Sequence, residues 1–241
     1  MVIYGLSDIG KVRETNQDCF KIEKLSENTG FAIVCDGMGG AKAGNIASNL
    51  AAEVISDYLK RSLKASMSST QIETILRSAV YSANTAVYEA SQKNENFKGM
   101  GTTVVLMYTD GSCIYIVHVG DSRAYSYNNN KITQITVDHS MVQSMVDNGQ
   151  LTPDEAKIHP SKNVITRALG VGADVNADLD FVDVYEEQII LLCSDGLSNF
   201  ATVDEICEQL NNFDDTVAKR LVNIANNNGG GDNVTAVVVK F

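Results

Sequence analysis

In the stretch Phe31-Ala32-Ile33-Val34-Cys35-Asp36-Gly37, five apolar residues run directly into an aspartate and a glycine. A short apolar run that ends at a turn pair is typical of a buried strand. Two later segments repeat the arrangement, because residues 114–119 lead to Gly120-Asp121 and residues 189–193 lead to Ser194-Asp195-Gly196. The ends of strands in packed sheets meet at one edge of the core. We therefore expect these three aspartates to lie close together.

The remaining pattern places helices and strands in separate groups. Apolar residues repeat at helical spacing in segments 46–59 and 72–90, so each predicted helix has one apolar face. Strands are predicted between residues 102 and 127, with a hairpin turn at Asp110-Gly111. Further strands are expected at 180–184, 188–193 and 234–239, and helices at 203–210 and 216–226. This grouping predicts an α+β fold in which helices pack on antiparallel sheets.

Length and composition indicate one globular domain that covers residues 1–241, without a linker or repeat. With 19 basic and 30 acidic residues, the net charge is -11, which argues against binding to nucleic acid or to anionic lipid. The five cysteines show no CxxC spacing and fit reduced thiols. No apolar run reaches the roughly 18 residues that a membrane span needs. We expect a cytoplasmic monomer.

Two more aspartates belong to the same pattern. Asp232 lies in a glycine-rich run before the last predicted strand, and Asp18 lies near the first strands. One Asp-Gly pair is most often only a turn. Five aspartates at strand ends would repel one another unless a cation lay between them.

The donor set of this cluster indicates the class of cation. Carboxylate oxygens suit Mn²⁺ or Mg²⁺, whereas the histidines at 118, 139 and 159 lack the spacing of zinc ligands. Two cations that share one aspartate would favour phosphate chemistry. Arg13 offers the fork of donors that binds phosphate. The run Gly37-Met38-Gly39-Gly40 fits no nucleotide-binding loop, so its glycines are expected to let the backbone approach a metal closely.

At this point the chain resembles a known family along nearly its whole length. It is similar to the bacterial metal-dependent protein Ser/Thr phosphatases of the PPM, or type 2C, family. The resemblance rests on motifs in the family's order: Arg13-Glu14-Thr15-Asn16-Gln17-Asp18, Asp36-Gly37-Met38-Gly39-Gly40 with Gly44, Gly101-Thr102-Thr103, Gly120-Asp121-Ser122-Arg123, Asp138-His139-Ser140, Thr166-Arg167-Ala168-Leu169-Gly170, Ser194-Asp195-Gly196-Leu197 and Gly231-Asp232-Asn233.

The resemblance implies an α/β/β/α sandwich of two antiparallel sheets flanked by helices, with two metal ions at the sheet edge. Asp36 would bridge both ions, Asp195 and Asp232 would bind the first, and the Gly37 carbonyl the second. Asp18 would hold water on the second ion.

By the same resemblance, Asp121 would hold a third, weaker metal together with Asp195. Arg13 would bind the substrate phosphate, and Asn233 would steady the loop around Asp232.

Two positions depart from the eukaryotic pattern of the family. Met38 replaces a histidine proposed as general acid, and Gln17 replaces a glutamate beside the metal; both resemble the bacterial subtype. The source of the leaving-group proton stays open. His139 is one candidate, and a structural role for this histidine is the alternative.

The resemblance implies hydrolysis of phosphoserine and phosphothreonine by a metal-bound water or hydroxide, with Mn²⁺ or Mg²⁺ and without a covalent phosphoenzyme. No arginine follows Cys35 or Cys193 by six positions, which argues against a cysteine phosphatase. The implied partners are phosphorylated proteins, including a cognate Ser/Thr protein kinase. The alternatives are a silent member that binds metal or a partner, and another metal hydrolase such as a phosphodiesterase or nuclease.

Residues 141–162 mix short helical patterns with Asn148-Gly149 and Thr152-Pro153, and they carry few large apolar residues. We predict that this segment forms a mobile flap beside the site. A plain surface helical hairpin is the alternative.

Overall fold

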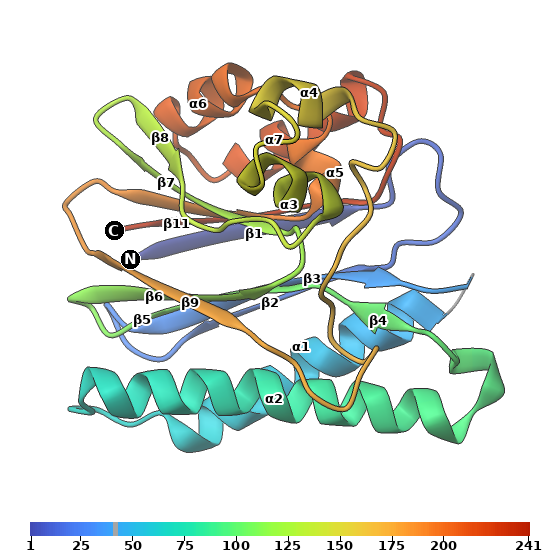
Figure 1. Cartoon of the computed structure of the whole chain (residues 1–241). Helices are drawn as coiled ribbons and strands as arrows, with labels where there is room; N and C mark the ends of the chain where they lie inside the picture. Colours follow the sequence, from blue (N-terminus) through green and yellow to red (C-terminus); the bar gives the residue numbers. More distant parts are fainter. Residues whose placement is uncertain (41–42) are drawn as a thin grey trace.

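Two antiparallel sheets face each other in the computed structural model, which describes residues 1–40 and 43–241 (Figure 1). The first sheet has the order β1 (Val2–Asp8), β11 (Val234–Lys240), β10 (Ile189–Cys193), β7 (Arg123–Asn128) and β8 (Lys131–Gln134). The second has the order β2 (Asp18–Lys24), β3 (Gly30–Met38), β5 (Val104–Thr109), β6 (Cys113–Val119) and β9 (Asp178–Asp183), and the short β4 (Gly101–Thr102) pairs with β3. The predicted pair of antiparallel sheets is confirmed.

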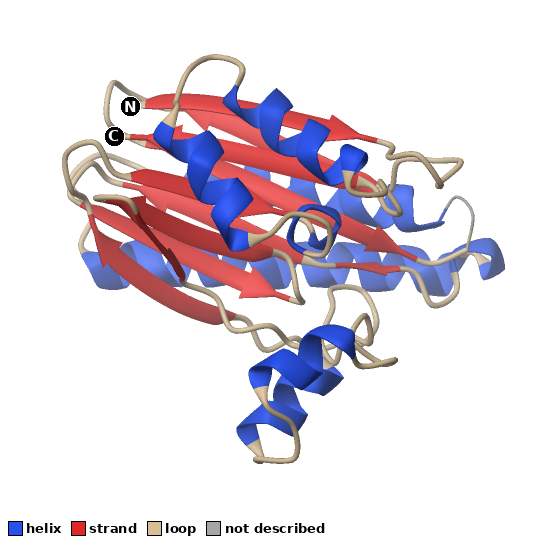
Figure 2. Ribbon diagram, turned by 90° about the horizontal axis from the view of Figure 1, so that it is seen from above, coloured by secondary structure: helices blue, strands red, loops and turns tan. Residues whose placement is uncertain are grey.

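Helices cover the outer face of each sheet (Figures 1 and 2). The long helices α1 (Ala43–Ser62) and α2 (Ser69–Lys93) pack on the second sheet, and α6 (Val203–Asn211) and α7 (Val217–Asn227) pack on the first. The expected α/β/β/α layering is therefore confirmed. The connecting elements are the short helix η1 (Glu95–Phe97), the helix α5 (Asp195–Ser198), and the helices α3 (Met141–Asp147) and α4 (Pro153–Ile158).

The unbroken apolar run of β3 is explained by burial on both faces of its sheet. Phe31, Ile33 and Cys35 pack in the cluster beneath α1 and α2, whereas Ala32 and Val34 belong to the layer between the two sheets. All five side chains are buried. Such a strand needs no alternation of polar and apolar residues, because neither face meets water.

Strand register brings the candidate residues to one edge of the sandwich. Asp18 and Asp36 are direct partners in the antiparallel pair of β2 and β3. Strand β1 pairs along its whole length with β11, from Val2 opposite Lys240 to Asp8 opposite Val234. The two chain ends therefore lie together at the edge opposite the loop that carries Asp232 (Figure 1).

The segment from 141 to 162 forms a small lobe of its own. Helices α3 and α4 project from the sandwich as a hairpin (Figure 2), and α4 contributes no buried residue. The predicted helical pattern is confirmed here, and the mobility of the flap stays a prediction. The five cysteines are free thiols, four of them on strands. Within the described residues, no helix has both the length and the apolar character needed to cross a membrane.

Candidate metal centre

Asp36 ends the apolar run of β3, and two threonines hold its backbone. Its amide donates to Thr103 Oγ1 at 3.0 Å, and its carbonyl accepts from Thr102 Oγ1 at 2.9 Å and from the Thr103 amide at 2.8 Å. Both threonines are buried. The Gly101-Thr102-Thr103 stretch thus fixes the place of Asp36 at the sheet edge.

Asp18 lies beside Asp36 and is 7% exposed. Its Oδ2 accepts hydrogen bonds from Ser194 Oγ and Thr235 Oγ1, both at 2.7 Å. Its Oδ1 is buried and has no hydrogen-bond partner among the described residues. A buried carboxylate oxygen without a partner is costly in free energy, and a cation or an ordered water on that cation would satisfy it.

Close contacts between backbones require the glycines beside Asp36 and Asp195. A Cβ on Gly37 would lie 2.1 Å from the Gly44 carbonyl oxygen, and a Cβ on Gly196 would lie 1.8 Å from the Asn233 carbonyl oxygen. Any side chain at either position would displace the neighbouring backbone. These glycines therefore do more than make turns. Gly37 lets β3 pack closely against α1, and Gly196 lets α5 pack closely against the loop that carries Asp232.

Asn233 connects the Asp232 loop to residues 9–17. Its Nδ2 donates to the carbonyl oxygens of Ile9 at 2.9 Å and Thr15 at 3.1 Å, and its Oδ1 accepts from the Gln17 amide at 2.8 Å. The side chain has the steadying contacts that the resemblance implied.

The carboxylates of the cluster raise one another's pKa. Burial is the largest cause, and it raises the pKa of Asp18 to about 7, that of Asp121 to about 7 and that of Asp195 to about 6. Repulsion from neighbouring aspartates adds to the effect in all three. The pKa of Asp36 is raised well above its usual value by burial and then by Asp18 and Asp195. A divalent cation would remove this repulsion, and the all-oxygen donor set suits Mn²⁺ or Mg²⁺.

Arg13 lies at the mouth of this cluster. Its Nη2 donates to Asp232 Oδ2 at 2.7 Å, and its side chain is half exposed, whereas that of Asp232 is 26% exposed. The hydrogen bond to Asp232 raises the pKa of Arg13, against the effect of burial, and Asp195 and Asp36 add to the rise. The structure thus brings Arg13 to the expected place, with a candidate metal ligand as its partner.

Asp121 follows β6 and is 8% exposed. Asp195 is its strongest charged neighbour, as expected for a pair that would share a cation. The adjacent Ser122 Oγ lies 2.7 Å from Thr103 Oγ1, which connects the Asp121 turn to the backbone of Asp36. The seven candidate residues therefore come from strand ends, from helix α5 and from loops that contact one another directly.

Sequence spacing missed a cluster of His118, His139 and Asp178, whose potential ligand atoms lie within 4.8 Å of one another. The two imidazole rings are stacked, with centroids 4.6 Å apart and planes 19° apart. An imidazole lone pair lies in the ring plane, so stacked rings cannot both point at one ion.

Hydrogen bonds give His139 a structural role. Its Nδ1 accepts from the Gly120 amide at 3.1 Å, and its Nε2 lies 3.2 Å from Asp178 Oδ2. Burial lowers the pKa of His139, and the ring is 6% exposed. Both ring nitrogens are thus engaged within the protein, which favours the structural alternative for His139.

Comparisons with known proteins agree with this arrangement. A family model described as protein phosphatase 2C matches residues 10–236. The serine/threonine phosphatase stp of Listeria welshimeri is 36% identical over 236 residues, which are 97% of this chain and 93% of that protein.

Two solved structures show how far the likeness extends in space. Stp1 from Staphylococcus aureus, a serine/threonine phosphatase, is 34% identical with a TM-score of 0.91, over 99% of this chain and 94% of that one. The catalytic domain of the serine/threonine protein phosphatase PstP, in complex with 2 manganese ions, is 32% identical with a TM-score of 0.83, over 98% and 96% of the two chains.

Proposed function

The chain belongs to the protein phosphatase 2C family and is a protein serine/threonine phosphatase of that type, and we propose that the acidic cluster is its active site. The cluster consists of Asp18, Asp36, Asp121, Asp195 and Asp232. The observation that carries the proposal is the buried, unpartnered Oδ1 of Asp18 among carboxylates that repel one another. Divalent cations bound here would satisfy that oxygen and offset the repulsion.

Each residue has its own task in the proposed site. Asp36, Asp195 and Asp232 would hold a first cation, and Asp36 and the Gly37 carbonyl would hold a second. Asp121, with Asp195, would hold a third, weaker cation. When bound, Mn²⁺ or Mg²⁺ lowers the pKa of an attacking water and neutralises charge on the phosphoryl oxygens. PstP, whose structure contains 2 manganese ions, supports this cofactor class.

The chain's own groups bind the substrate and orient the water. Asp18 accepts a hydrogen bond from the nucleophilic water and so fixes its direction of approach; the Ser194 and Thr235 hydroxyls hold the carboxylate in place. Arg13 exchanges its contact with Asp232 for the substrate phosphate, which its planar fork fits. Attack by water on phosphorus releases the serine or threonine oxygen in one step, without a covalent phosphoenzyme. The proton that the leaving oxygen needs comes from a water near Asp121.

We propose phosphorylated proteins as the substrates, among them a Ser/Thr protein kinase whose products this enzyme reverses. A monomer in the cytoplasm suits this task. The net charge of -11 disfavours nucleic acid as a substrate.

Phosphate release from a phosphothreonine peptide tests the proposal. We expect release with Mn²⁺, none with a chelator, and nearly none from Asp36→Asn, which removes the carboxylate that both cations share. The matched control is Asp57→Asn, at an exposed position of helix α1 outside the flap, which should release phosphate at the normal rate. Calorimetry should show weakened Mn²⁺ binding only in Asp36→Asn. Near-normal turnover of that variant would refute the two-cation site, and cleavage of a phosphodiester in preference to the peptide would indicate another hydrolase.

A further inference from the structure

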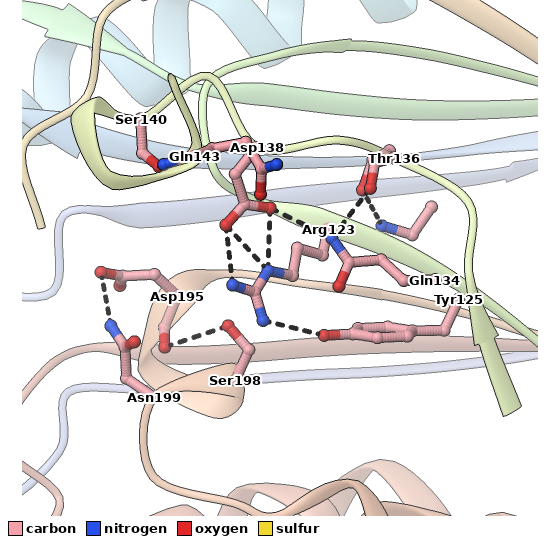
Figure 3. Close-up of polar contacts among 11 residues, drawn as sticks. Arg123, Tyr125, Gln134, Thr136, Asp138, Ser140, Gln143, Asp195, Ser198 and Asn199 are labelled. Carbon is pink, nitrogen blue, oxygen red and sulfur yellow. Dashed lines mark hydrogen bonds and ion pairs between the residues drawn. The ribbon is translucent and has the colours of Figure 1, made fainter. Parts of the chain in front are cut away.

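A partly buried ion pair joins the Asp121 turn to the start of the flap. Arg123 Nε lies 2.9 and 3.1 Å from the two carboxylate oxygens of Asp138, and Nη2 donates to Oδ2 at 2.7 Å (Figure 3). The third nitrogen, Nη1, donates to the Tyr125 hydroxyl at 3.2 Å. The two charged side chains are 27% and 12% exposed. All three guanidinium nitrogens are therefore engaged, and their geometry is fixed.

Stability alone does not explain this pair. Two charges lose solvation when they are buried, so an apolar pair of the same volume is often as stable. Burial is the largest single influence and acts to lower the pKa of Arg123, but the hydrogen bonds and charge attraction of Asp138 and Tyr125 together outweigh it, so the pKa is raised. The guanidinium is thus charged and held by hydrogen bonds to Asp138 and Tyr125. Such a pair is well suited to hold two segments of the chain in one relative orientation.

The geometry that it fixes is the entry to the flap. Asp138 lies just before Ser140, which caps the N-terminus of α3. Gln134 Nε2 donates to Asp138 Oδ1 at 3.2 Å, and the His139 amide donates to the Gly120 carbonyl at 3.0 Å. The Arg123–Asp138 pair and the His139 amide bond hold residues 134–139 alongside residues 120–125, the segment that carries Asp121.

The exit of the flap is held on the other side of the site. The Leu169 amide donates to the Thr102 carbonyl at 2.8 Å, and Thr102 Oγ1 donates to the Asp36 carbonyl. The Thr166 amide donates to the His139 carbonyl at 2.8 Å, so entry and exit are also bonded to each other. Since α4 buries no residue and α3 buries only Val142, the orientation of the flap depends largely on this base.

We propose that Arg123 is a positioning residue for phosphoprotein substrates: through Asp138 it sets the orientation of the flap relative to the site. This inference rests on the proposed function. A phosphopeptide extends beyond its phosphate and meets the flap, whereas a small aryl phosphate does not reach it. Loss of the fork therefore affects the larger substrate selectively.

Arg123→Lys tests the proposal, because lysine keeps the charge but cannot make the fork. We expect kcat/KM for a phosphothreonine peptide to fall about tenfold, the loss of one charge-assisted hydrogen bond. For an aryl phosphate it should stay within about twofold, because the metal ligands are untouched. Amide exchange across residues 141–162 should become faster. Asp138→Asn should have the same effects, and the double variant should be no worse than either single one.

The matched control is Arg220→Lys. Arg220 is also 27% exposed and also makes several bonds, to Asp214, Gln209 and Asn212, but it joins α6 to α7 away from the flap. This variant should leave flap exchange and the ratio between the two substrates unchanged. If Arg123→Lys does not fold, Gln134→Ala, which removes one bond to Asp138, should show the same pattern to a smaller extent.

Two results would overturn the proposal: equal losses on both substrates with flap exchange unchanged, or additive losses in the double variant. Failure of the wild-type protein to release phosphate would instead refute the proposed function. Flap exchange does not depend on activity, so it tests the fork separately.

Discussion

Asn233→Ala should both destabilise the protein and weaken its cation site. Asn233 is 5% exposed and makes three hydrogen bonds with backbone groups of Ile9, Thr15 and Gln17. At about 1 kcal/mol for each bond, the variant should lose about 3 kcal/mol of unfolding free energy. For a chain of this size, this corresponds to a fall in Tm of roughly 6–12 °C.

The same loss should reach the cations, because Asn233 connects two parts of the site. Asn233 follows Asp232 directly, and its side chain accepts a hydrogen bond from the Gln17 amide. The carbonyl of the same Gln17 accepts a hydrogen bond from the Gly37 amide at 3.1 Å. If about 1 kcal/mol of the loss appears in binding, Mn²⁺ affinity should fall about fivefold. Thermal unfolding with chelator measures the first effect, and calorimetry with Mn²⁺ measures the second.

Asn84 provides a matched control on helix α2. It is fully buried and also donates two bonds, to the carbonyls of Gly172 and Ala173, and accepts one from the Gly170 amide. Asn84→Ala should cost a similar 3 kcal/mol or so while Mn²⁺ affinity stays within about twofold. If both variants lowered Mn²⁺ affinity equally, general loosening of the fold would explain the effect, and the reasoning about Asn233 would be wrong.

Three further outcomes are expected. Arg13→Ala should raise KM and lower kcat/KM by roughly ten- to hundredfold. Mn²⁺ affinity, measured by calorimetry, should not fall, because the variant removes a positive charge beside Asp232. A parallel fall in Mn²⁺ affinity would show that Arg13 has a structural role. Asp121→Ala should keep the two tight cations but lower kcat, more for a phosphothreonine peptide, whose leaving oxygen needs a proton, than for an aryl phosphate; equal losses would contradict a leaving-group role. Burial lowers the pKa of His118 to about 4, so its neutral form favours folding. That contribution to the free energy of unfolding is present above the unfolded pKa of about 6.5, and about 3 kcal/mol of it should be lost as pH falls from about 6.5 through 4. Urea unfolding of His118→Phe should show a free energy of unfolding that depends less on pH in this window.

The residue pattern was sufficient to predict helices on antiparallel sheets and aspartates at strand ends, for a physical reason, whereas the sandwich of two sheets was implied by the resemblance. Strands such as β3 and β10 are buried on both faces, so their apolar runs are continuous, and the residue after the run must lie at the sheet edge. Asp36 and Asp195 could therefore be placed before any contact was known. The helices α1 and α7 were equally visible, because one apolar face at helical spacing is a strong signal.

The contacts between distant segments could not be predicted in this way. Arg123 and Asp138 are 15 residues apart, and nothing in their spacing indicates that they form a bidentate pair. The stack of His118 on His139 arises only because β6 ends beside the segment that enters the flap. The expected role of Gly37 was likewise incomplete, since its close contact is with the Gly44 carbonyl. Such features depend on how separate elements pack, which local patterns do not encode.

The pairing of β1 with β11 has a practical consequence for handling the protein. Met1 and Phe241 emerge side by side at one edge of the sandwich, and Asp232 lies beyond the other end of the same seven-residue strands. At about 3.3 Å for each residue, these strands are about 23 Å long. A purification tag, a fluorescent reporter or a surface linker attached at either terminus would therefore point away from the proposed active site. A short peptide joining the two termini would allow new ends to be opened elsewhere in the chain.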